Sequence, residues 1–300
     1  MDRTDGHASQ AAPLTLAYVT DRGLFKPSVF SAFSALKHAK TPVRLLFVGL
    51  DLTDAMKRAL VSLAARFPHH VVEPFALPQD WLREARSPKN FITPTALGRM
   101  FLPRITGGRV LYIDGDTMVP GDVSTAGAID LKGRPIAGVR DFTVQRWRAL
   151  GAQDKLARQA ALFGGTVSLE NYINSGVLLM DCDAIRAEPA LQAAMEDMKA
   201  AQGYPTVDQD RINLVFNGRI TPLDPAWNCS WGRLARQRRD MAGLSVEGAT
   251  ATPRILHFHG PNKPWQRLRL STLRKGGFHI LRYRRLMGEC ERAIPELGAL

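Results

Sequence analysis

The first quarter of the chain alternates short apolar runs with amphipathic stretches. The apolar runs end in turn signals, which is typical of buried strands, while apolar side chains at helical spacing indicate helices between them. The predicted strands are residues 14–20, 43–49 and 71–73, and the predicted helices begin at Pro27 and cover 55–66. A strand–helix–strand order of this kind predicts a parallel sheet with crossover helices.

The same pattern continues toward the C-terminus. Further strands are predicted at 109–113, 135–139, 172–180, 218–223 and 254–258, and helices at 95–105, 183–201 and 207–217. The stretch 142–170 is polar without a clear period, and we expect it to be an irregular segment that faces a substrate. The fold class is therefore α/β, with a mixed, mainly parallel Rossmann-like sheet flanked by helices.

Composition narrows the class of protein. The chain has 300 residues, of which 45% are hydrophobic and 23% charged, as in an ordinary globular protein of one or two domains. No apolar run is long enough for a transmembrane helix, and the acidic N-terminus lacks the apolar core of a secretory signal. Three widely separated cysteines without a C-x-x-C pattern predict neither a zinc site nor a disulfide framework, and a reducing cytoplasm is the simplest setting.

Positive charge is concentrated near the C-terminus. The net charge is +12, and residues 254–288 contain nine Lys and Arg but no Asp or Glu. Such a field attracts anions. Because aromatic and aliphatic side chains interleave with arginine, we expect residues 266–300 to form a basic amphipathic helical segment whose part 266–288 binds an anionic membrane surface. A solvated surface is the plain alternative, and no nucleic acid is expected because no nucleic-acid module is apparent.

Two aspartates follow the predicted strand at 109–113. Asp114 and Asp116 come directly after it, with Gly115 between them. Ligands of α/β sheets bind beyond the carboxyl ends of the strands, and carboxylate oxygens suit Mg²⁺ or Mn²⁺ that bridges substrate phosphates. A strand that ends in a turn explains an isolated D-x-D equally well, so the metal site depends on the other segments.

A second candidate segment runs from His257 to Trp265. His257 and His259 alternate with apolar residues, so both point to one face of a strand end, and an imidazole can complete a metal site begun by carboxylates. Gly260 permits close backbone approach to a ligand, and Lys263 can meet a diphosphate. The plain alternative is a strand leaving for a loop, with a structural histidine.

Two more segments present polar groups beside buried elements. Residues 172–181 have a polar, glycine-containing opening that leads into a buried strand, and small residues there let the backbone and the Asn174 amide touch a sugar. The plain alternative is an ordinary strand start. Residues 206–210 place Asp208 and Gln209 in the first turn of a helix, where acidic side chains are favourable on local grounds alone. The functional interpretation puts both beside the transferred sugar.

Taken in order, the four segments resemble glycosyltransferase family 8, a retaining group that includes bacterial lipooligosaccharide galactosyltransferases and glycogenin. The resemblance runs from about Leu14 to Trp265, and it depends on D-x-D, N-x-G-V-L-L, D-Q-D and H-x-x-G-x-x-K-P-W together. It implies a GT-A type domain at 14–265, between a disordered lead-in at 1–13 and the basic segment at 266–300. It also implies transfer of a hexose, galactose or glucose, from a UDP-sugar to a saccharide acceptor such as a lipooligosaccharide or polysaccharide.

Matching residues carry the implied roles. The ligands of Mn²⁺ or Mg²⁺ would be Asp114, Asp116 and His257. The donor-binding residues around uridine, diphosphate and sugar would be Asp21, Arg99, Asp114, Asn174, Asp208, Gln209, Gly260 and Lys263. Asp141 matches a family aspartate on the acceptor side. An aromatic residue that often packs on the uracil is replaced by Leu24, with Phe25 next to it, and His259 has no counterpart in many members.

The residue types also bear on the mechanism. A double displacement needs a carboxylate under the anomeric carbon, but the resemblance implies that Gln209 occupies this position, and Gln209 is an amide and a poor nucleophile. We therefore expect a front-face mechanism, with Asp208 orienting sugar hydroxyls, in an enzyme at the inner, cytoplasmic face of a membrane that holds a lipid-linked acceptor. Two alternatives remain open: another metal-dependent enzyme acting on nucleoside diphosphates, such as a pyrophosphohydrolase or nucleotidyltransferase, and a non-catalytic saccharide- or nucleic-acid-binding protein.

Overall fold

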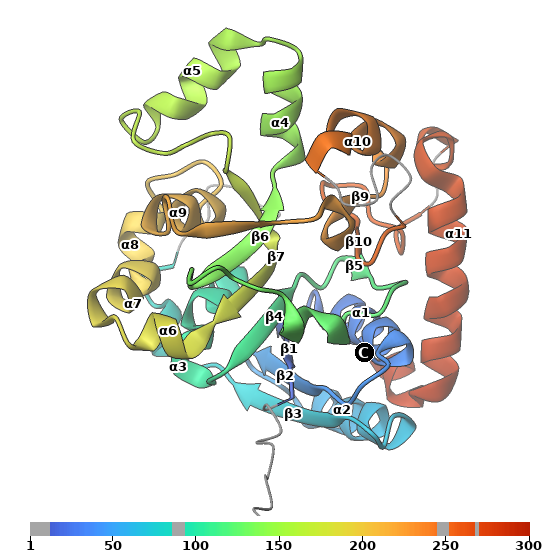
Figure 1. Ribbon diagram of the computed structural model, residues 1–300. Coiled ribbons are helices and arrows are strands. Elements are labelled where there is room, and N and C mark those ends of the chain that lie inside the picture. The colour runs from blue at the N-terminus through green and yellow to red at the C-terminus, as the bar shows by residue number, and fades with distance from the viewer. Residues whose placement is uncertain (1–12, 86–93, 245–251, 268–269) are drawn as a thin grey trace, which may run out of the picture.

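A seven-stranded mixed sheet forms the centre of the computed structural model, which describes residues 13–85, 94–244, 252–267 and 270–300 (Figure 1). The strand order is β3-β2-β1-β4-β7-β6-β8. The strands are β1 (Thr15–Thr20), β2 (Arg44–Gly49), β3 (Val71–Ala76), β4 (Arg109–Ile113), β6 (Ile136–Arg140), β7 (Ile173–Asp181) and β8 (Ile220–Leu223). Only β7 runs antiparallel to its neighbours within this sheet, so the predicted mixed, mainly parallel sheet is confirmed.

A second, three-stranded sheet brings distant segments together. Its strands are β5 (Thr117–Met118), β10 (Leu256–His257) and β9 (Cys229–Ser230), in the order β5-β10-β9. Each strand has only two residues, so β5 and β9 are too short for a hydrophobic pattern to predict them. The pairing of His257 with Thr117 places the histidine segment directly beside the D-x-D segment.

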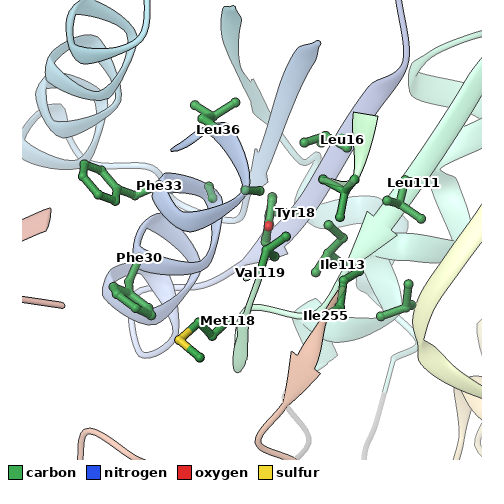
Figure 2. Packing of buried hydrophobic residues seen from close by; sticks show 14 of the residues in the cluster. Leu16, Tyr18, Phe30, Phe33, Leu36, Leu111, Ile113, Met118, Val119 and Ile255 are labelled. Atoms are coloured by element: carbon green, nitrogen blue, oxygen red, sulfur yellow. The ribbon is translucent and has the colours of Figure 1, made fainter. Parts of the chain in front are cut away.

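Helices cover both faces of the large sheet. On one face lie α1 (Phe25–His38), α2 (Asp54–Arg66) and α11 (Leu270–Ala293); the other face carries α3 (Leu102–Ile105), α6 (Cys182–Arg186), α7 (Pro189–Glu196), α8 (Met198–Ala201) and α9 (Asp208–Val215). Figure 2 shows α1 side chains facing those of β1 and β4 in the first of these cores: Phe30, Phe33, Leu36, Leu16, Tyr18, Leu111 and Ile113. The sheet is thus buried on both sides, as parallel sheets require.

Three predicted elements differ from the structure. The helix expected at 95–105 is a 3₁₀ helix at Pro94–Phe101 followed by the short helix α3. The single helix expected at 183–201 is three short helices, because Pro189 forces Glu188 out of helical geometry and Asp197 leaves it to cap α8 through the Ala200 N–H at 2.8 Å. The irregular segment expected at 142–170 contains α4 (Phe142–Ala149) and α5 (Gln153–Ala161). No residue of α5 is buried, so the apolar signal that reveals a packed helix is weak there.

The C-terminal segment is helical, as its sequence predicts, and α11 packs along α1 (Figure 1). Its inward side chains Ile280, Tyr283 and Cys290 belong to the main core. Near its start, a Cβ at Gly276 would lie 3.1 Å from the Trp231 ring and carbonyl oxygen, so glycine allows a close approach at this position. The predicted lead-in falls, apart from residue 13, outside the described residues.

Candidate active site

One cavity of about 640 Å³ collects the predicted site residues at the carboxyl ends of β1 and β4. This is within the range of small-molecule and cofactor sites, roughly 300–1,000 Å³. Its lining includes all of them: Asp21, Arg99, Asp114, Asp116, Asp141, Asn174, Asp208, Gln209, His257, Gly260 and Lys263. Residues separated by up to 242 positions (Asp21 to Lys263) therefore face one space.

A candidate cation site lies on one wall of this cavity. Ligand atoms of Asp114, Asp116 and His257 all lie within 4.8 Å of one another. His257 Nε2 is 3.1 Å from Asp116 Oδ1 and 3.8 Å from Asp114 Oδ2, and Lys263 Nζ lies 2.5 Å from Asp116 Oδ2. The pairing of β5 with β10 holds this arrangement, since the Phe258 N–H also donates to the Asp116 carbonyl at 2.9 Å.

Asp114 is oriented from behind by two side chains. Tyr112 donates its hydroxyl to Asp114 Oδ1 at 2.5 Å, and Arg99 Nη2 lies 3.0 Å from the same oxygen. Arg99 also stacks over the Tyr112 ring, with its guanidinium carbon 4.5 Å from the centroid. With Oδ1 occupied in this way, Oδ2 is the oxygen that faces His257.

Two glycines keep the wall free of side chains. A Cβ at Gly176 would lie 2.4 Å from the His257 ring and 2.7 Å from Asp114 Oδ2, so only glycine leaves the cation site open. A Cβ at Gly115 would lie 2.0 Å from Ser28 Oγ on α1. The glycine between the two aspartates is thus required by packing, whatever the site binds.

The charges of this group are strongly coupled. Burial raises the pKa of Asp114, although Arg99 opposes the effect. Burial acts the same way on Asp116, but the positive charges of His257 and Lys263 outweigh it and hold the pKa of that carboxyl well below its usual range. Burial alone would lower the pKa of His257, yet Asp116 and Asp114 raise it. The two carboxylates therefore draw positive charge toward one point, as a cation site does.

A chain of amides fixes the orientation of His257. The Gly176 N–H donates to Asn174 Oδ1 at 3.0 Å, and Asn228 Nδ2 donates to the same oxygen at 2.8 Å. The remaining Asn228 Oδ1 therefore faces His257 Nδ1, 3.0 Å away. Nδ1 must carry the hydrogen, and Nε2 points at the carboxylates, which is the orientation a metal-binding imidazole needs.

The same chain continues to the opposite wall. Asn174 Nδ2 donates to Gln209 Oε1 at 2.9 Å, and the Ser175 N–H donates to it at 3.3 Å. Gln209 Nε2 donates to the Tyr172 hydroxyl at 3.2 Å and to Asp141 Oδ2 at 3.4 Å. The amide oxygen of Gln209 is thus already engaged by two donors.

The carboxylates of the D-Q-D segment face different ways. Asp208 lines the cavity, accepts from Ser175 Oγ at 2.9 Å and lies 3.4 Å from Arg99 Nη1. Asp210 is fully buried and accepts from the Tyr172 hydroxyl at 2.5 Å and from the Thr206 N–H at 2.9 Å. Val207, between Thr206 and Asp208, has φ 50° and ψ −101°, a conformation costly for a β-branched residue. The hydrogen bonds of the buried Asp210 to Tyr172 and Thr206 therefore hold a strained turn at the site.

The remaining predicted residues line other parts of the cavity. Leu24 lines it beside Asp21, whose carboxylate accepts from the Leu24 N–H at 3.0 Å, whereas Phe25 packs edge-on to Phe47 in the core. No aromatic ring from this turn therefore faces the space near Asp21. Asp141 caps α4, accepting from the Thr143 and Val144 N–H groups, and burial raises its pKa.

His259 lies at the edge of the cavity. Its Nε2 is 2.7 Å from Ser230 Oγ, and its ring meets that of His257 edge-on at 5.5 Å. Burial lowers the pKa of His259 to about 3, with a further contribution from the charge of His257, so the ring is neutral near pH 7.

Three residues of the site were not predicted from the sequence. Tyr112 lies two positions before Asp114, so strand alternation could have placed it on the same face. Ser175 follows Asn174 in the candidate segment 172–181, which was identified by its asparagine and not by its serine. Asn228 gave no signal, because its approach to His257 depends on the parallel pairing of β9 with β10.

Comparison with known proteins places these features in a family. The model of glycosyl transferase family 8 matches residues 15–269. Among curated proteins, "Probable galacturonosyltransferase-like 3" of Arabidopsis thaliana is 24% identical over 287 residues, covering 87% of this chain and 77% of the relative.

Solved structures share the fold. The galactosyltransferase LgtC, in complex with donor and acceptor sugar analogues, superposes with a TM-score of 0.73 at 18% identity, covering 92% of this chain and 95% of LgtC. The bifunctional glycosyltransferase WbbM gives a TM-score of 0.71 at 19% identity, and this chain spans only 49% of it. The mixed sheet flanked by helices is thus the GT-A-like architecture of LgtC.

Proposed function

The chain belongs to glycosyl transferase family 8, and from this premise we propose that it transfers a hexose, galactose or glucose, from a UDP-sugar to a saccharide acceptor with retention of the anomeric configuration. The observation that carries the proposal is the single cavity in which Asp114, Asp116 and His257 face the amides of Asn174 and Gln209. If the donor diphosphate binds at Asp114, Asp116 and His257, the donor sugar lies beside the amides of Asn174 and Gln209. Members of the family typically use a nucleotide-sugar donor and a divalent cation.

The residues present fit Mn²⁺ or Mg²⁺. Two carboxylates and one imidazole nitrogen are suitable donors for these ions, Gly176 leaves room, and Asn228 presents the Nε2 lone pair of His257. When bound, the cation neutralises charge on the diphosphate leaving group. Lys263 adds positive charge at the same place, and Gly260, with φ 90°, lets the backbone approach the diphosphate closely.

The sugar-side residues support a front-face reaction. The acceptor oxygen forms a bond to the anomeric carbon while the bond between the anomeric carbon and the β-phosphate oxygen breaks. The acceptor proton passes to the departing phosphate. Gln209 and Asn174 position the sugar, and Asp208 orients its hydroxyls. Asp210 is enclosed by Tyr172 and Thr206, so it is poorly placed to act as a nucleophile.

Gln209→Ala tests this mechanism. Because the Gln209 oxygen is held by Asn174 and Ser175, we expect the variant to lose positioning but to retain measurable transfer, lowered about 10²-fold or less. Transfer rates and a search for a trapped glycosyl-enzyme by mass spectrometry check the prediction. Complete loss with donor binding intact, together with a covalent adduct in the wild type, would show a double displacement instead.

The donor and the metal requirement are tested without an acceptor. We expect slow, Mn²⁺-dependent hydrolysis of one or two members of a panel comprising UDP-galactose, UDP-glucose, UDP-galacturonate and UDP-N-acetylglucosamine. Release of UDP in the presence and absence of EDTA is the measurement. Formation of UMP and sugar 1-phosphate in place of UDP, or hydrolysis of UDP itself, would instead indicate a pyrophosphohydrolase.

We also propose that α11 binds an anionic membrane surface that carries the acceptor. Among the described residues no helix is long and apolar enough to cross a bilayer. Phe278, Leu281, Arg282 and Arg285 are all exposed and follow the i, i+3, i+4, i+7 spacing of one helix face. Ile280 and Tyr283 are buried in the core, so the opposite stripe is the face that remains for a lipid surface among the described side chains of α11.

The double variant Arg282→Gln/Arg285→Gln tests this surface. Each arginine near an anionic surface contributes about 1 kcal/mol, so we expect binding to weaken about 30-fold. Cosedimentation with vesicles containing phosphatidylserine, compared with phosphatidylcholine alone, measures it. Deleting the segment is unsuitable because Ile280 and Tyr283 are core residues. The control is Leu150→Ser, which removes an apolar residue after α4 that is as exposed as Leu281. Unchanged binding of the double variant would contradict the proposal.

A further inference from the structure

A second, smaller cavity adjoins the sugar end of the first. Its volume is about 120 Å³, and Asp141, Asn174 and His259 line both cavities. The other lining residues come from the end of β6, the start of α4 and the β9–α10 region: Val139, Arg140, Phe142, Thr143, Asn228, Ser230 and Gln237. A group bound there would lie next to Gln209, whose amide contacts both Asp141 and Asn174.

The walls of this second cavity are firmly built. Helix α10 (Leu234–Asp240) is tied to α4 by an ion pair of 3.0 Å between Arg146 and Asp240. The buried Gln237 accepts from the Ser230 N–H and donates to the Asn228 carbonyl. The cavity is thus bounded by side chains that already hold one another.

Two arginines beside this cavity, Arg140 and Arg233, have no carboxylate within ion-pair distance among the described residues, although the charge of Glu170 acts on Arg140. On α4, Arg146 pairs with Asp240 and Arg148 with Glu170. Arg140 instead donates to the Glu170 carbonyl at 3.0 Å and to Asn171 Oδ1 at 3.1 Å, and burial lowers its pKa. Arg233 lies over the Phe142 ring at 5.9 Å, and its charge helps to lower the pKa of His259. In the described part of the chain, neither guanidinium forms an ion pair.

We infer that the second cavity is the acceptor subsite and that it takes a saccharide bearing an anionic substituent, a carboxylate or a phosphate, bound by Arg233 and Arg140. The inference rests on the proposed glycosyltransferase function and names its acceptor class. Guanidinium groups bind both kinds of anion in a planar, two-pronged geometry, and partial burial strengthens such contacts. Arg233 does not line the cavity itself, but its guanidinium lies 5.9 Å from the ring of Phe142, which does.

The test compares matched acidic and neutral sugars. The probes are methyl galactoside and methyl glucoside, each with its uronic acid and its 6-phosphate, measured for binding to the enzyme with Mn²⁺ and UDP and for transfer from the preferred UDP-sugar. We expect the acidic sugar of at least one pair to bind about tenfold or more tightly than its neutral partner, the size of one charge-assisted hydrogen bond. The two acids show whether a carboxylate or a phosphate is preferred.

Arginine variants connect that preference to the cavity. Arg233→Gln and Arg140→Gln should each remove most of it, and thermal unfolding shows whether each variant is folded. Arg236→Gln changes an exposed arginine on α10, three positions after Arg233, and should keep the preference. The inference would be overturned if acidic and neutral sugars bound and reacted equally, or if neither kind bound or reacted. It would also be overturned if folded Arg233→Gln kept the preference for the acidic sugar. Failure of the wild type to hydrolyse any UDP-sugar would contradict the proposed function instead.

Discussion

Asp116→Asn should lower turnover of the UDP-sugar about 10³-fold, the largest effect we expect from one substitution. Both oxygens of this carboxylate face nitrogen atoms, Oδ1 toward His257 Nε2 and Oδ2 toward Lys263 Nζ. The amide has nearly the same shape but no charge, so it loses the attraction for a divalent cation and leaves the diphosphate less neutralised. A 10³-fold loss corresponds to about 4 kcal/mol of transition-state stabilisation.

Two measurements separate the chemistry from a folding defect. Mn²⁺ affinity in the presence of UDP, followed by electron paramagnetic resonance, should fall together with kcat for UDP-sugar hydrolysis. Thermal unfolding should change little, because Lys263 keeps its bond to the Phe258 carbonyl at 3.0 Å. Asp54→Asn, which alters an exposed aspartate on α2, is the control. Wild-type Mn²⁺ affinity in Asp116→Asn would exclude the proposed cation site.

Local patterns in the sequence predict much of the fold. The strands β1, β2 and β4 are short apolar runs, and Thr53 caps α2 as its position before that helix suggests, accepting from the Met56 N–H at 3.3 Å. The apolar positions Met56, Leu60 and Leu63 are buried on one face of α2. These features depend on neighbours within one or two turns, so the information lies in consecutive residues.

Other features depend on partners that are far apart in the chain. The antiparallel direction of β7 is set by pairing with β4 and β6, and its apolar run alone reads the same in either direction. The two-residue strand β9 carries no period, yet its pairing with β10 brings Asn228 to His257 across 29 positions. Arg99 likewise reaches Asp114 and Asp208 from a turn of 3₁₀ helix at Pro94–Phe101, where a regular helix was expected.

The candidate site shows the same division. Motif order identifies Asp114, Asp116, His257 and Gln209, because each lies in a recognisable segment. The groups that aim them, Tyr112 and Asn228, belong to no motif and act through hydrogen bonds that only the folded chain creates. Sequence therefore predicts which residues face the cavity better than it predicts what holds them in place.

Substitution of Asn228 should show that the two walls of the cavity are coupled. In Asn228→Leu, His257 Nδ1 loses its acceptor and Asn174 Oδ1 loses a donor, so we expect Mn²⁺ affinity to fall about 10- to 100-fold. In Asn228→Asp, the carboxylate still accepts from His257 but repels Asn174 Oδ1. Mn²⁺ affinity should then stay within a few-fold of the wild type while kcat for the sugar donor falls.

The contrast between these two variants is the informative result. If Asn228 had a merely structural role, both variants would lower thermal stability and kcat together. Their Mn²⁺ binding would then fall only as far as the folded fraction falls. A positioning role predicts that only the leucine variant loses the metal, since only it leaves His257 Nδ1 without an acceptor. Asn217→Leu, which removes an asparagine bonded at Ser168 and Thr166 away from the donor cavity, is the control. Equal metal affinity in the leucine and aspartate variants would mean that Asn228 does not orient His257. The link from the cation site to the sugar side would then run through Gly176 and Arg99.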